Sequence, residues 1–170
     1  MPKIPTREHP ASIIYESVEQ VRSPAVMELH AYWHSKLGGR LMPSPADIDP
    51  SEIRRLLPSI IIAEYLAEPV RVRYRLVGTL QVYYNGLDFT GLYLDEIDWG
   101  IENDFVRLVH QTLLATAAPV VGHYEWGFRD NILGFAEFGV FPLSEDGKNV
   151  ARCIGLDDFL PFETQLGKPR

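Results

Sequence analysis

Among the residues whose types could bind a metal ion or act as a nucleophile, a closely spaced pair of histidines and the single cysteine are considered first. His30 and His34 stand four positions apart, so a helix would bring both side chains to one face, where they could share a metal ion. No third ligand stands out near them, and we interpret both as surface histidines, with no metal site. Cys153 is the only cysteine, so it has no partner for an internal disulfide, and we expect a buried thiol.

Acidic residues and glycine-rich loops give no further sign of catalysis. The sequence contains no G-x-S-x-G, P-loop or G-x-G-x-x-G motif. The carboxylates are scattered, and no pair is placed by a helix face for acid–base chemistry. Glu125 and Glu137, on expected strands, are the acids that a small enzyme with a buried carboxyl could use. We predict that the protein is not an enzyme and name no catalytic residue.

The charge balance and the apolar pattern exclude two further classes of protein. The sequence has 16 basic and 23 acidic residues and a net charge of -7, whereas nucleic-acid binding needs clustered basic charge. The longest apolar run, at 60–63, is far too short to span a bilayer, and the N-terminus has no apolar leader. A single cysteine suits a reducing compartment. We predict a cytoplasmic protein that binds no nucleic acid and does not insert into membranes.

The first element that could position a site is a helix with clear ends. Ser23 is a good N-cap, Pro24 suits the first helical position, and Gly38-Gly39 supplies the stop. Its apolar residues recur at helical spacing and must be buried against a partner or against the chain's own sheet. We predict a homodimer through this stripe, with packing inside one chain as the alternative. The stripe consists of Val26, Leu29, Trp33 and Leu37.

Further along the chain, strands flank a helical middle. Runs at 59–66 and 70–77 are rich in β-branched residues or alternate in polarity, which predicts two strands. A long helix is expected over 103–117, and three strands at 120–128, 135–143 and 149–157. This order indicates an α+β fold. The predicted segments are an arm at 1–22, a helix and connector at 23–48, one domain at 49–160 and a tail at 161–170.

Two short segments then point to a family. They are Tyr74-Arg75-Leu76-Val77-Gly78-Thr79 and Asp88-Phe89-Thr90-Gly91, together with Pro43 in the connector. With the order of the elements, they resemble the PAS domain family, and within it the small stand-alone alphaproteobacterial branch. The resemblance implies a PAS-like five-stranded antiparallel sheet with short helices and one long connecting helix, preceded here by N-terminal helices.

The same resemblance bears on how a signal would leave the domain. Many PAS domains end in an Asp-Ile-Thr-like motif that couples to an output module, and Leu156-Asp157-Asp158-Phe159 matches it only loosely. About a dozen residues follow Asp158, which is too few for an output module. We therefore expect a signalling protein partner in trans.

Motif residues near the second strand are interpreted as structural rather than as ligand contacts. We expect Arg75 to pair with Asp95 or Glu96, and Gly78 to adopt a positive φ. Thr90 and Gly91 are expected to form a helix cap and a turn. The structural set is Arg75, Gly78, Thr79, Thr90 and Gly91.

Members of the family bind small ligands or cofactors between the sheet and the helices, which implies a pocket here. His110 lies about 140° from the mean apolar direction of the long helix, which argues against haem. No cysteine occupies residues 78–102, so covalent flavin photochemistry does not fit the family pattern. We expect an unidentified small apolar ligand or none, and no coloured cofactor. The predicted pocket residues are Tyr74, Leu76, Phe105, Leu108, Val109, Thr112, Tyr124, Trp126 and Phe138.

Three functions follow from these observations. The first is a stand-alone sensory or interaction domain that acts by ligand binding, protein contacts or both in signal transduction. The second is a small α+β-cone enzyme of the ketosteroid-isomerase or cyclase type, which also places a curved sheet over an apolar cavity. The third is a purely structural dimerisation domain with a filled core. The order of the strands favours the first over the second.

Overall fold

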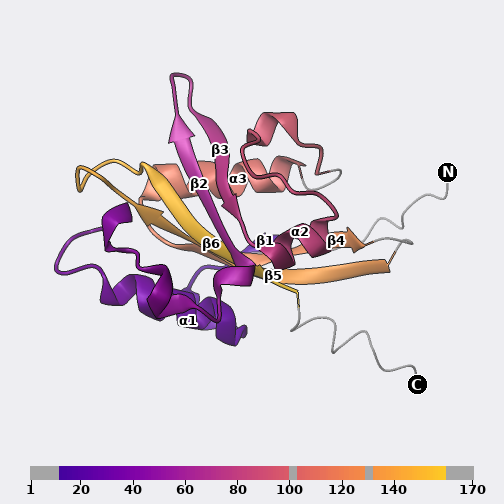
Figure 1. Cartoon of the computed structure of the whole chain (residues 1–170), viewed down its shortest axis with the longest axis horizontal. Coiled ribbons are helices and arrows are strands. Elements are labelled where there is room, and N and C mark those ends of the chain that lie inside the picture. Colours follow the sequence, from indigo (N-terminus) through magenta and orange to yellow (C-terminus); the bar gives the residue numbers. More distant parts are fainter. Residues whose placement is uncertain (1–11, 100–102, 129–131, 160–170) are drawn as a thin grey trace.

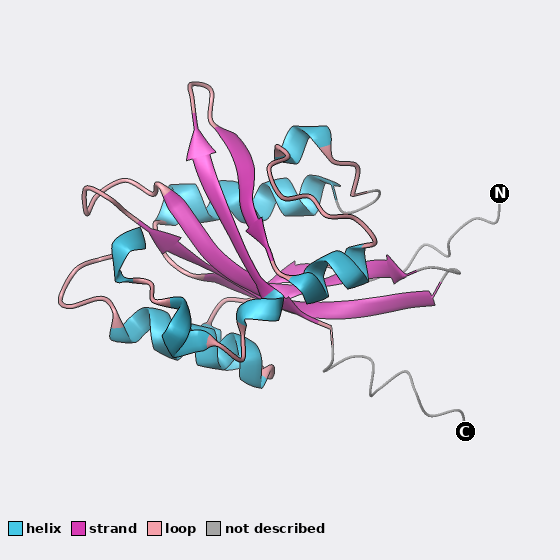
Figure 2. Cartoon of the chain, viewed as in Figure 1, coloured by secondary structure: helices cyan, strands magenta, loops and turns pink. Residues whose placement is uncertain are grey.

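The computed structural model describes residues 12–99, 103–128 and 132–159; of these, the side chains of 125–128 and 132–135 are not described. Within these residues, six strands form one antiparallel sheet in the order β1-β4-β5-β6-β2-β3, and helices lie on both of its faces (Figures 1 and 2). The strands are β1 (Ile13–Ile14), β2 (Ile60–Leu66), β3 (Arg71–Val77), β4 (Val120–Phe128), β5 (Ile132–Leu143) and β6 (Arg152–Asp158). The α-helices are α1 (Pro24–Ser35), α2 (Thr79–Asn85) and α3 (Asn103–Thr116), and the 3-10 helices are η1 (Val18–Gln20), η2 (Pro45–Asp47), η3 (Pro50–Ile53), η4 (Leu57–Ser59) and η5 (Leu94–Glu96).

The predicted α+β, PAS-like fold is confirmed, with one added strand. All the strands predicted from the sequence are present, and α3 connects β3 to β4 as expected. The addition is β1, whose Ile13 and Ile14 pair with His123 and Gly122 of β4. A strand of two residues is too short to show the alternation on which a prediction depends.

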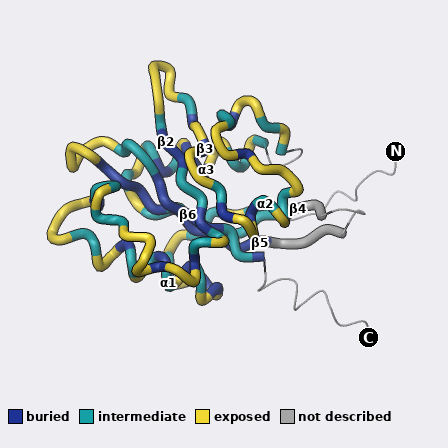
Figure 3. Tube along the Cα trace, in the orientation of Figure 1, coloured by how far each residue is buried: buried dark blue, intermediate teal, exposed yellow. Residues whose placement is uncertain are grey.

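Two apolar cores lie on opposite faces of the sheet, one under α1 and one under α3. In the first core, α1 packs on the outer faces of β5 and β6. The second core joins α3 to the other face of the same strands. Figure 3 shows that the buried segments follow the central strands between these two layers. One sheet therefore supports two packing layers, and a cavity lies in the α3 layer.

The apolar stripe of α1 belongs to the first core, which corrects the predicted dimer helix. Val26 and Leu29 have no exposed surface, Trp33 is 4% exposed, and Leu37 packs partly buried at the margin of the same core. The Trp33 indole N–H also donates a 2.8 Å hydrogen bond to the carbonyl of Pro142. The stripe is thus buried against the chain's own sheet, where a partner subunit could not contact it.

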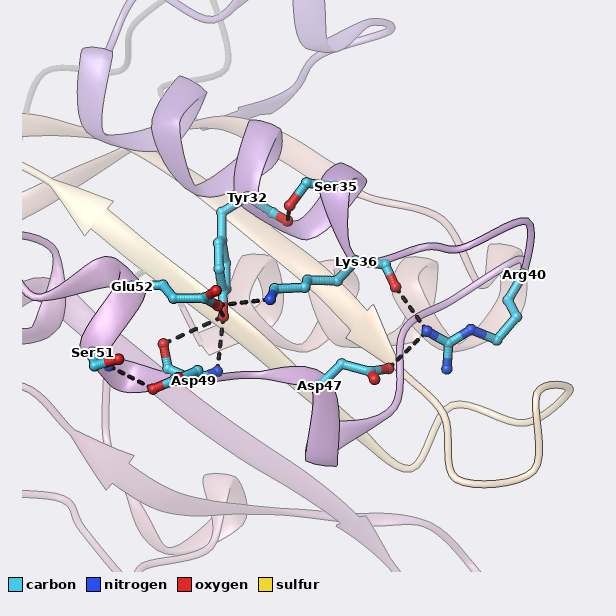
Figure 4. A network of polar contacts seen from close by, with 8 residues as sticks. All are labelled: Tyr32, Ser35, Lys36, Arg40, Asp47, Asp49, Ser51 and Glu52. Atoms are coloured by element: carbon cyan, nitrogen blue, oxygen red, sulfur yellow. Dashed lines mark hydrogen bonds and ion pairs between the residues drawn. The ribbon is translucent and has the colours of Figure 1, made fainter.

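A polar network fixes the connector between α1 and β2 (Figure 4). The Tyr32 hydroxyl donates to Glu52 at 2.9 Å and accepts the backbone N–H of Asp49 at 2.8 Å. The Lys36 ammonium lies 2.7 Å from the same Glu52 carboxylate. Because these groups are exposed, the network orients the connector more than it stabilises the fold.

Gly78 is required for lack of space and not for a positive φ, which corrects the sequence interpretation. Its φ is -65°, a value that any residue adopts. A Cβ at this position would overlap the carbonyl oxygen of Pro58 and lie 2.7 Å from the carbonyl oxygen of Leu57. The close approach lets the Gly78 N–H donate a 2.7 Å hydrogen bond to the Ile60 carbonyl, and this bond joins the start of α2 to β2.

We expect Gly78→Ala to lower the free energy of unfolding by about 1–3 kcal/mol, because the clash is with backbone that cannot rotate away. Gly86→Ala is the control. Gly86 has a φ of 69° but open space around it. Gly86→Ala should therefore lower the free energy of unfolding by about 1 kcal/mol through backbone conformation alone. Urea unfolding of both variants measures the difference. A smaller loss for Gly78→Ala than for Gly86→Ala would contradict the steric account.

Candidate functional site: a cavity between the sheet and α3

A cavity of about 290 Å³ lies between the inner face of the sheet, α3 and the segment from α2 to η5. Its walls are mainly apolar and aromatic, with a few polar groups among them. Leu87 and Asp98 line it and are also exposed, so this is where the cavity meets the surface. The lining residues are Ile61, Ala63, Tyr74, Tyr84, Asn85, Leu87, Phe89, Ile97, Asp98, Trp99, Phe105, Val106, Val109, His110, Tyr124, Phe138, Val140, Cys153, Gly155, Leu156 and Asp157.

The structure brings part of the predicted pocket set together at this cavity. The predicted residues that line it are Tyr74, Phe105, Val109, Tyr124 and Phe138. Three predicted residues, Leu76, Leu108 and Thr112, lie elsewhere. Trp126 falls outside the described side chains.

A bulge explains why Leu76 is not at the cavity. The register of β2 and β3 shifts between Ile62 and Ala63, so Ala63 pairs with Tyr74 and Ile62 with Leu76. Arg75 is the extra residue, and one extra residue moves every later side chain to the other face of the sheet. Leu76 therefore lies on the face opposite to Tyr74 and is 43% exposed.

The orientation of α3 also differs from the prediction. Leu108 is 48% exposed, and the Thr112 hydroxyl donates to the Leu108 carbonyl of its own helix at 2.7 Å. The buried residues are Val109, His110 and Leu113. The inner face is thus turned by roughly 80° about the helix axis from the expected one.

His110, expected to point away from the pocket, lines it. Its Nδ1 lies 2.9 Å from the Tyr65 hydroxyl, and its ring contacts the Tyr74 ring edge-to-face. Burial lowers the pKa of His110 to about 4, so the imidazole is neutral at physiological pH. A hydrogen-bond partner from β2, distant in the sequence, offsets the cost of burying the ring.

Cys153 belongs to the same wall and has no reactive character. Burial raises the pKa of its thiol to about 11, although a hydrogen bond with Tyr65 opposes that shift. Because thiolates, and not thiols, are the nucleophiles, Cys153 is inert at neutral pH.

Asp157 is the polar residue of the cavity that the sequence analysis considered only as a motif match. It lies on β6 opposite Phe138, and the Tyr124 hydroxyl hydrogen-bonds to its side chain. Burial raises the pKa of this carboxyl to about 6. Gln81 of α2 donates to the Asp157 backbone carbonyl at 2.9 Å, so α2 is bonded directly to this position.

Trp99 contributes a buried polar atom without a partner. Its indole Nε1 has no hydrogen-bond acceptor within the described part of the chain. Tyr74, Phe89 and Trp99 form a cluster with centroids 4.8 Å apart for Tyr74–Phe89 and 5.0 Å for Phe89–Trp99. A buried donor left unpaired costs about 1–3 kcal/mol, which a ligand with an acceptor would recover.

The motif residues lie outside the cavity. Gly91 has a φ of 85° in a turn, and its N–H donates to the Tyr74 carbonyl at 2.6 Å. Thr90 caps no helix: its N–H donates to the Asp88 carboxylate at 3.0 Å within that turn. Thr79 is exposed at the first position of α2.

Arg75 pairs with a different acid from those expected. It lies 3.5 Å from Glu64, which Arg73 also contacts at 3.3 Å, whereas Asp95 is bound by Arg71. The Arg75 side chain is 54% exposed, whereas the Glu64 side chain is only 9% exposed, and Arg73 would still pair with Glu64 if Arg75 were lost.

We therefore expect Arg75→Ala to change the free energy of unfolding by less than about 1 kcal/mol, below the 1–3 kcal/mol that a buried pair would imply. Arg73→Ala, at the other side of Glu64, should behave alike, because either arginine alone still neutralises the carboxylate. Thermal melting of both variants and of their double mutant provides the measurement. A loss above 2 kcal/mol for Arg75→Ala alone would contradict this reading.

Other candidate sites are not assembled. Within the described ranges, no group of three or more His, Cys, Asp or Glu side chains is placed to hold a metal ion. His30 lies against Trp33 and Phe141, with its ring 6.2 Å from that of His34. None of the described helices is long and apolar enough to cross a bilayer.

Of the two acids considered for an enzyme, the one whose side chain is described is not at the cavity. Glu137 is buried but faces the α1 side, where its carboxylate accepts hydrogen bonds from the backbone N–H groups of Arg22 and Ser23. The side chain of Glu125 lies outside the described ones.

Comparison with known proteins identifies the family. A family model described as PAS domain matches residues 21–156. The chain therefore belongs to the PAS domain family, a family of sensory and interaction domains. Its alphaproteobacterial branch stays a prediction.

The solved structures that are similar to the chain include the following two. An RNA-binding light-oxygen-voltage receptor is 15% identical, with a TM-score of 0.47; the likeness covers 66% of this chain and 33% of the receptor, so the chain spans one third of its length. The PAS domain of a protein from Colwellia psychrerythraea is 10% identical, with a TM-score of 0.46, and the likeness covers 66% of this chain and 98% of that domain. No curated protein matches the chain.

Proposed function

We propose that this PAS domain is a sensory module that holds a small, largely apolar ligand in the cavity beside α3 and acts through protein contacts. The observation that carries the proposal is a cavity of about 290 Å³ with a buried indole N–H that lacks an acceptor among the described residues. Small-molecule sites span about 300–1,000 Å³, so the ligand is at the small end of the range. The signalling partner in trans and the cytoplasmic location predicted from the sequence belong to the same proposal.

The other two functions have less support. Of the two acids considered for a cone-type enzyme, Glu137 lies on the face of the sheet opposite the cavity. The acid at the cavity is Asp157, and the family match favours a sensory domain over an enzyme. A purely structural domain would have a filled core, whereas this core has open space. A homodimer would have to use a surface other than the buried stripe of α1.

We further propose that the ligand is neither haem nor a covalently bound flavin. A porphyrin is larger than the cavity, and the Nδ1 of His110 is engaged by Tyr65. The adduct of a flavin photoreceptor needs a reactive thiol, and the Cys153 thiol has a pKa of about 11. The purified protein should therefore be colourless.

The experiment compares wild type with a variant in which the cavity is filled. Ala63→Leu adds bulk directly into the cavity, while Ala115→Leu makes the same change on the exposed side of α3. We expect native mass spectrometry or a thermal-shift screen to detect a bound small molecule in wild type and Ala115→Leu but not in Ala63→Leu. Ala63→Leu should melt no lower than wild type without ligand, because it fills open space.

Two results would contradict the proposal. One is a Soret or flavin absorption band in the purified protein. The other is equal ligand binding by wild type and Ala63→Leu, which would place the ligand elsewhere. If neither protein bound any small molecule, the structural function with a core closed to ligands would replace it.

A further inference from the structure

The charged groups of the cavity have one sign. Asp98 and Asp157 line it, whereas no lysine or arginine is among the described residues of its wall. His110 adds no positive charge, because its burial keeps the imidazole neutral above a pKa of about 4. The whole chain carries a net charge of -7, which also favours the approach of cations over anions.

Asp157 is placed to receive a positive charge. Its side chain lines the cavity and is bonded by the Tyr124 hydroxyl. A carboxylate has about four acceptor sites, so the bond from Tyr124 leaves capacity for a ligand donor. Among the described residues no basic side chain forms an ion pair with it, and its carboxylate is half-buried, so ionising it without a cation nearby carries a desolvation cost. A cationic ligand would remove that cost.

Aromatic rings enclose the same space from several elements. Phe105 of α3 and Tyr124 of β4 lie beside Phe138 of β5, with ring centroids 5.8 and 6.1 Å from it. The second group of rings, around Tyr74 of β3, closes the cavity from the side of Trp99. The faces of aromatic rings attract organic cations, and cages of such rings recognise ammonium groups. The rings of the wall are those of Tyr74, Tyr84, Phe89, Trp99, Phe105, Tyr124 and Phe138.

Resting on the proposed function, we infer that the cavity selects small organic cations: an ammonium group that binds beside Asp157, on an apolar body that packs against the aromatic rings. Neutral molecules of the same shape would bind more weakly, and carboxylates weakest of all.

Three probes of nearly equal size test the charge preference. Benzylamine is cationic, benzyl alcohol neutral and benzoate anionic at pH 7.5. We expect isothermal titration calorimetry to give benzylamine at least about tenfold higher affinity than benzyl alcohol, since a charge-assisted hydrogen bond is worth about 1.5–3 kcal/mol. Benzoate should bind less tightly than either.

A matched pair of variants assigns the preference to one carboxylate. Asp157→Asn should reduce benzylamine affinity to that of benzyl alcohol while benzyl alcohol binding is kept. Asp158→Asn removes the same charge from the next residue, which turns to the other face of β6 and bonds Ser23. Asp158→Asn should leave the preference for benzylamine over benzyl alcohol unchanged. Melting curves verify that both variants fold.

A pH series on the wild type tests the same point without any variant. The pKa of Asp157 is raised, so the carboxylate is protonated at pH 5 and ionised at pH 7.5, while benzylamine stays cationic throughout. Benzylamine affinity should rise about tenfold over this interval, and benzyl alcohol affinity should change little. The other titratable groups that face Asp157 are Tyr74, Tyr84, Asp98, His110, Tyr124 and Cys153.

The outcomes separate this inference from the proposed function. Equal affinity for benzylamine and benzyl alcohol, or tighter binding of benzoate, would overturn the cation preference and leave ligand binding standing. A preference that survives in Asp157→Asn and is lost in Asp158→Asn would also overturn it. If none of the three probes bound at millimolar concentration, both the inference and the proposed function would fail.

Discussion

Trp33→Ala is expected to lower the free energy of unfolding by about 3–5 kcal/mol without changing the oligomeric state. The side chain is 4% exposed and packs against Phe141, so its removal leaves a large hole between α1 and the sheet. The same change strands the Pro142 carbonyl, which accepts the indole N–H at 2.8 Å. Urea unfolding measures the loss in the free energy of unfolding. Light scattering on wild type and on the variant gives the mass of each protein in solution.

The control for this prediction lies on the same helix. Met27 is 52% exposed, so Met27→Ala should cost less than about 0.5 kcal/mol. If the apolar stripe of α1 instead formed a subunit interface, Trp33→Ala would dissociate a dimer and leave the melting temperature of the subunit nearly unchanged. That pattern would restore the dimer helix that the structure places inside the chain.

The start and end of α1 were predictable because their determinants are local. The Ser23 hydroxyl accepts the N–H of Val26 at 3.1 Å, and Pro24 occupies the first helical position. After the helix, Gly38 and Gly39 both have positive φ values, 55° and 79°. Each of these features depends on residues within four positions, which is the range that sequence patterns report. The positions of the strands along the chain were predictable for the same reason.

The facing of individual side chains was not predictable, because it depends on distant partners. The bulge at Arg75 arises from how β3 pairs with β2, and alternation within β3 alone assigns Leu76 to the wrong face. Likewise, the apolar residues of α3 indicate a face centred near Phe105 and Thr112. The observed face includes His110, because Tyr65 of β2 supplies its hydrogen bond. Both errors affect the pocket list and leave the fold unchanged.

Asp157, in contrast, carried a signal that could have been used. In a strand over 149–157, alternate residues share a face, so Asp157 lies on the same side as Cys153. Because Cys153 is expected in the core, the same alternation predicts that the Asp157 side chain also faces the core. The family motif concerns the position of Asp157 at the end of the strand and carries no information on where its side chain points.

Glu137→Ala should also be severely destabilising, by about 3–5 kcal/mol, although no ligand or catalytic role is assigned to it. The carboxylate is 1% exposed and accepts three hydrogen bonds. Two come from the backbone N–H groups of Arg22 and Ser23, at 2.8 and 2.6 Å, and the third from the Tyr15 hydroxyl, at 2.9 Å. Alanine removes the acceptor and leaves these donors without it, each at a cost of about 1–3 kcal/mol unless water enters.

The positions of these donors predict which segments would open first when the Glu137 carboxylate is removed. Arg22 and Ser23 directly precede α1, so the carboxylate also lies at the positive end of that helix. Tyr15 joins the strand β1 to β4 through its own N–H, which donates to Val121 at 2.7 Å. Hydrogen exchange at the Tyr15 amide should therefore accelerate in Glu137→Ala well before exchange in β2 and β6.

Two further variants complete the test of Glu137. Glu137→Gln keeps one side-chain oxygen as an acceptor, so its loss should be smaller than that of alanine. Glu145→Ala removes an exposed carboxylate from the turn after β5 and should change stability by less than about 0.5 kcal/mol. If Glu137→Ala lost less than 1 kcal/mol, the buried carboxylate would not anchor the segment before α1. Because Glu137 faces away from the cavity, ligand binding measured well below the melting temperature should persist in every one of these variants.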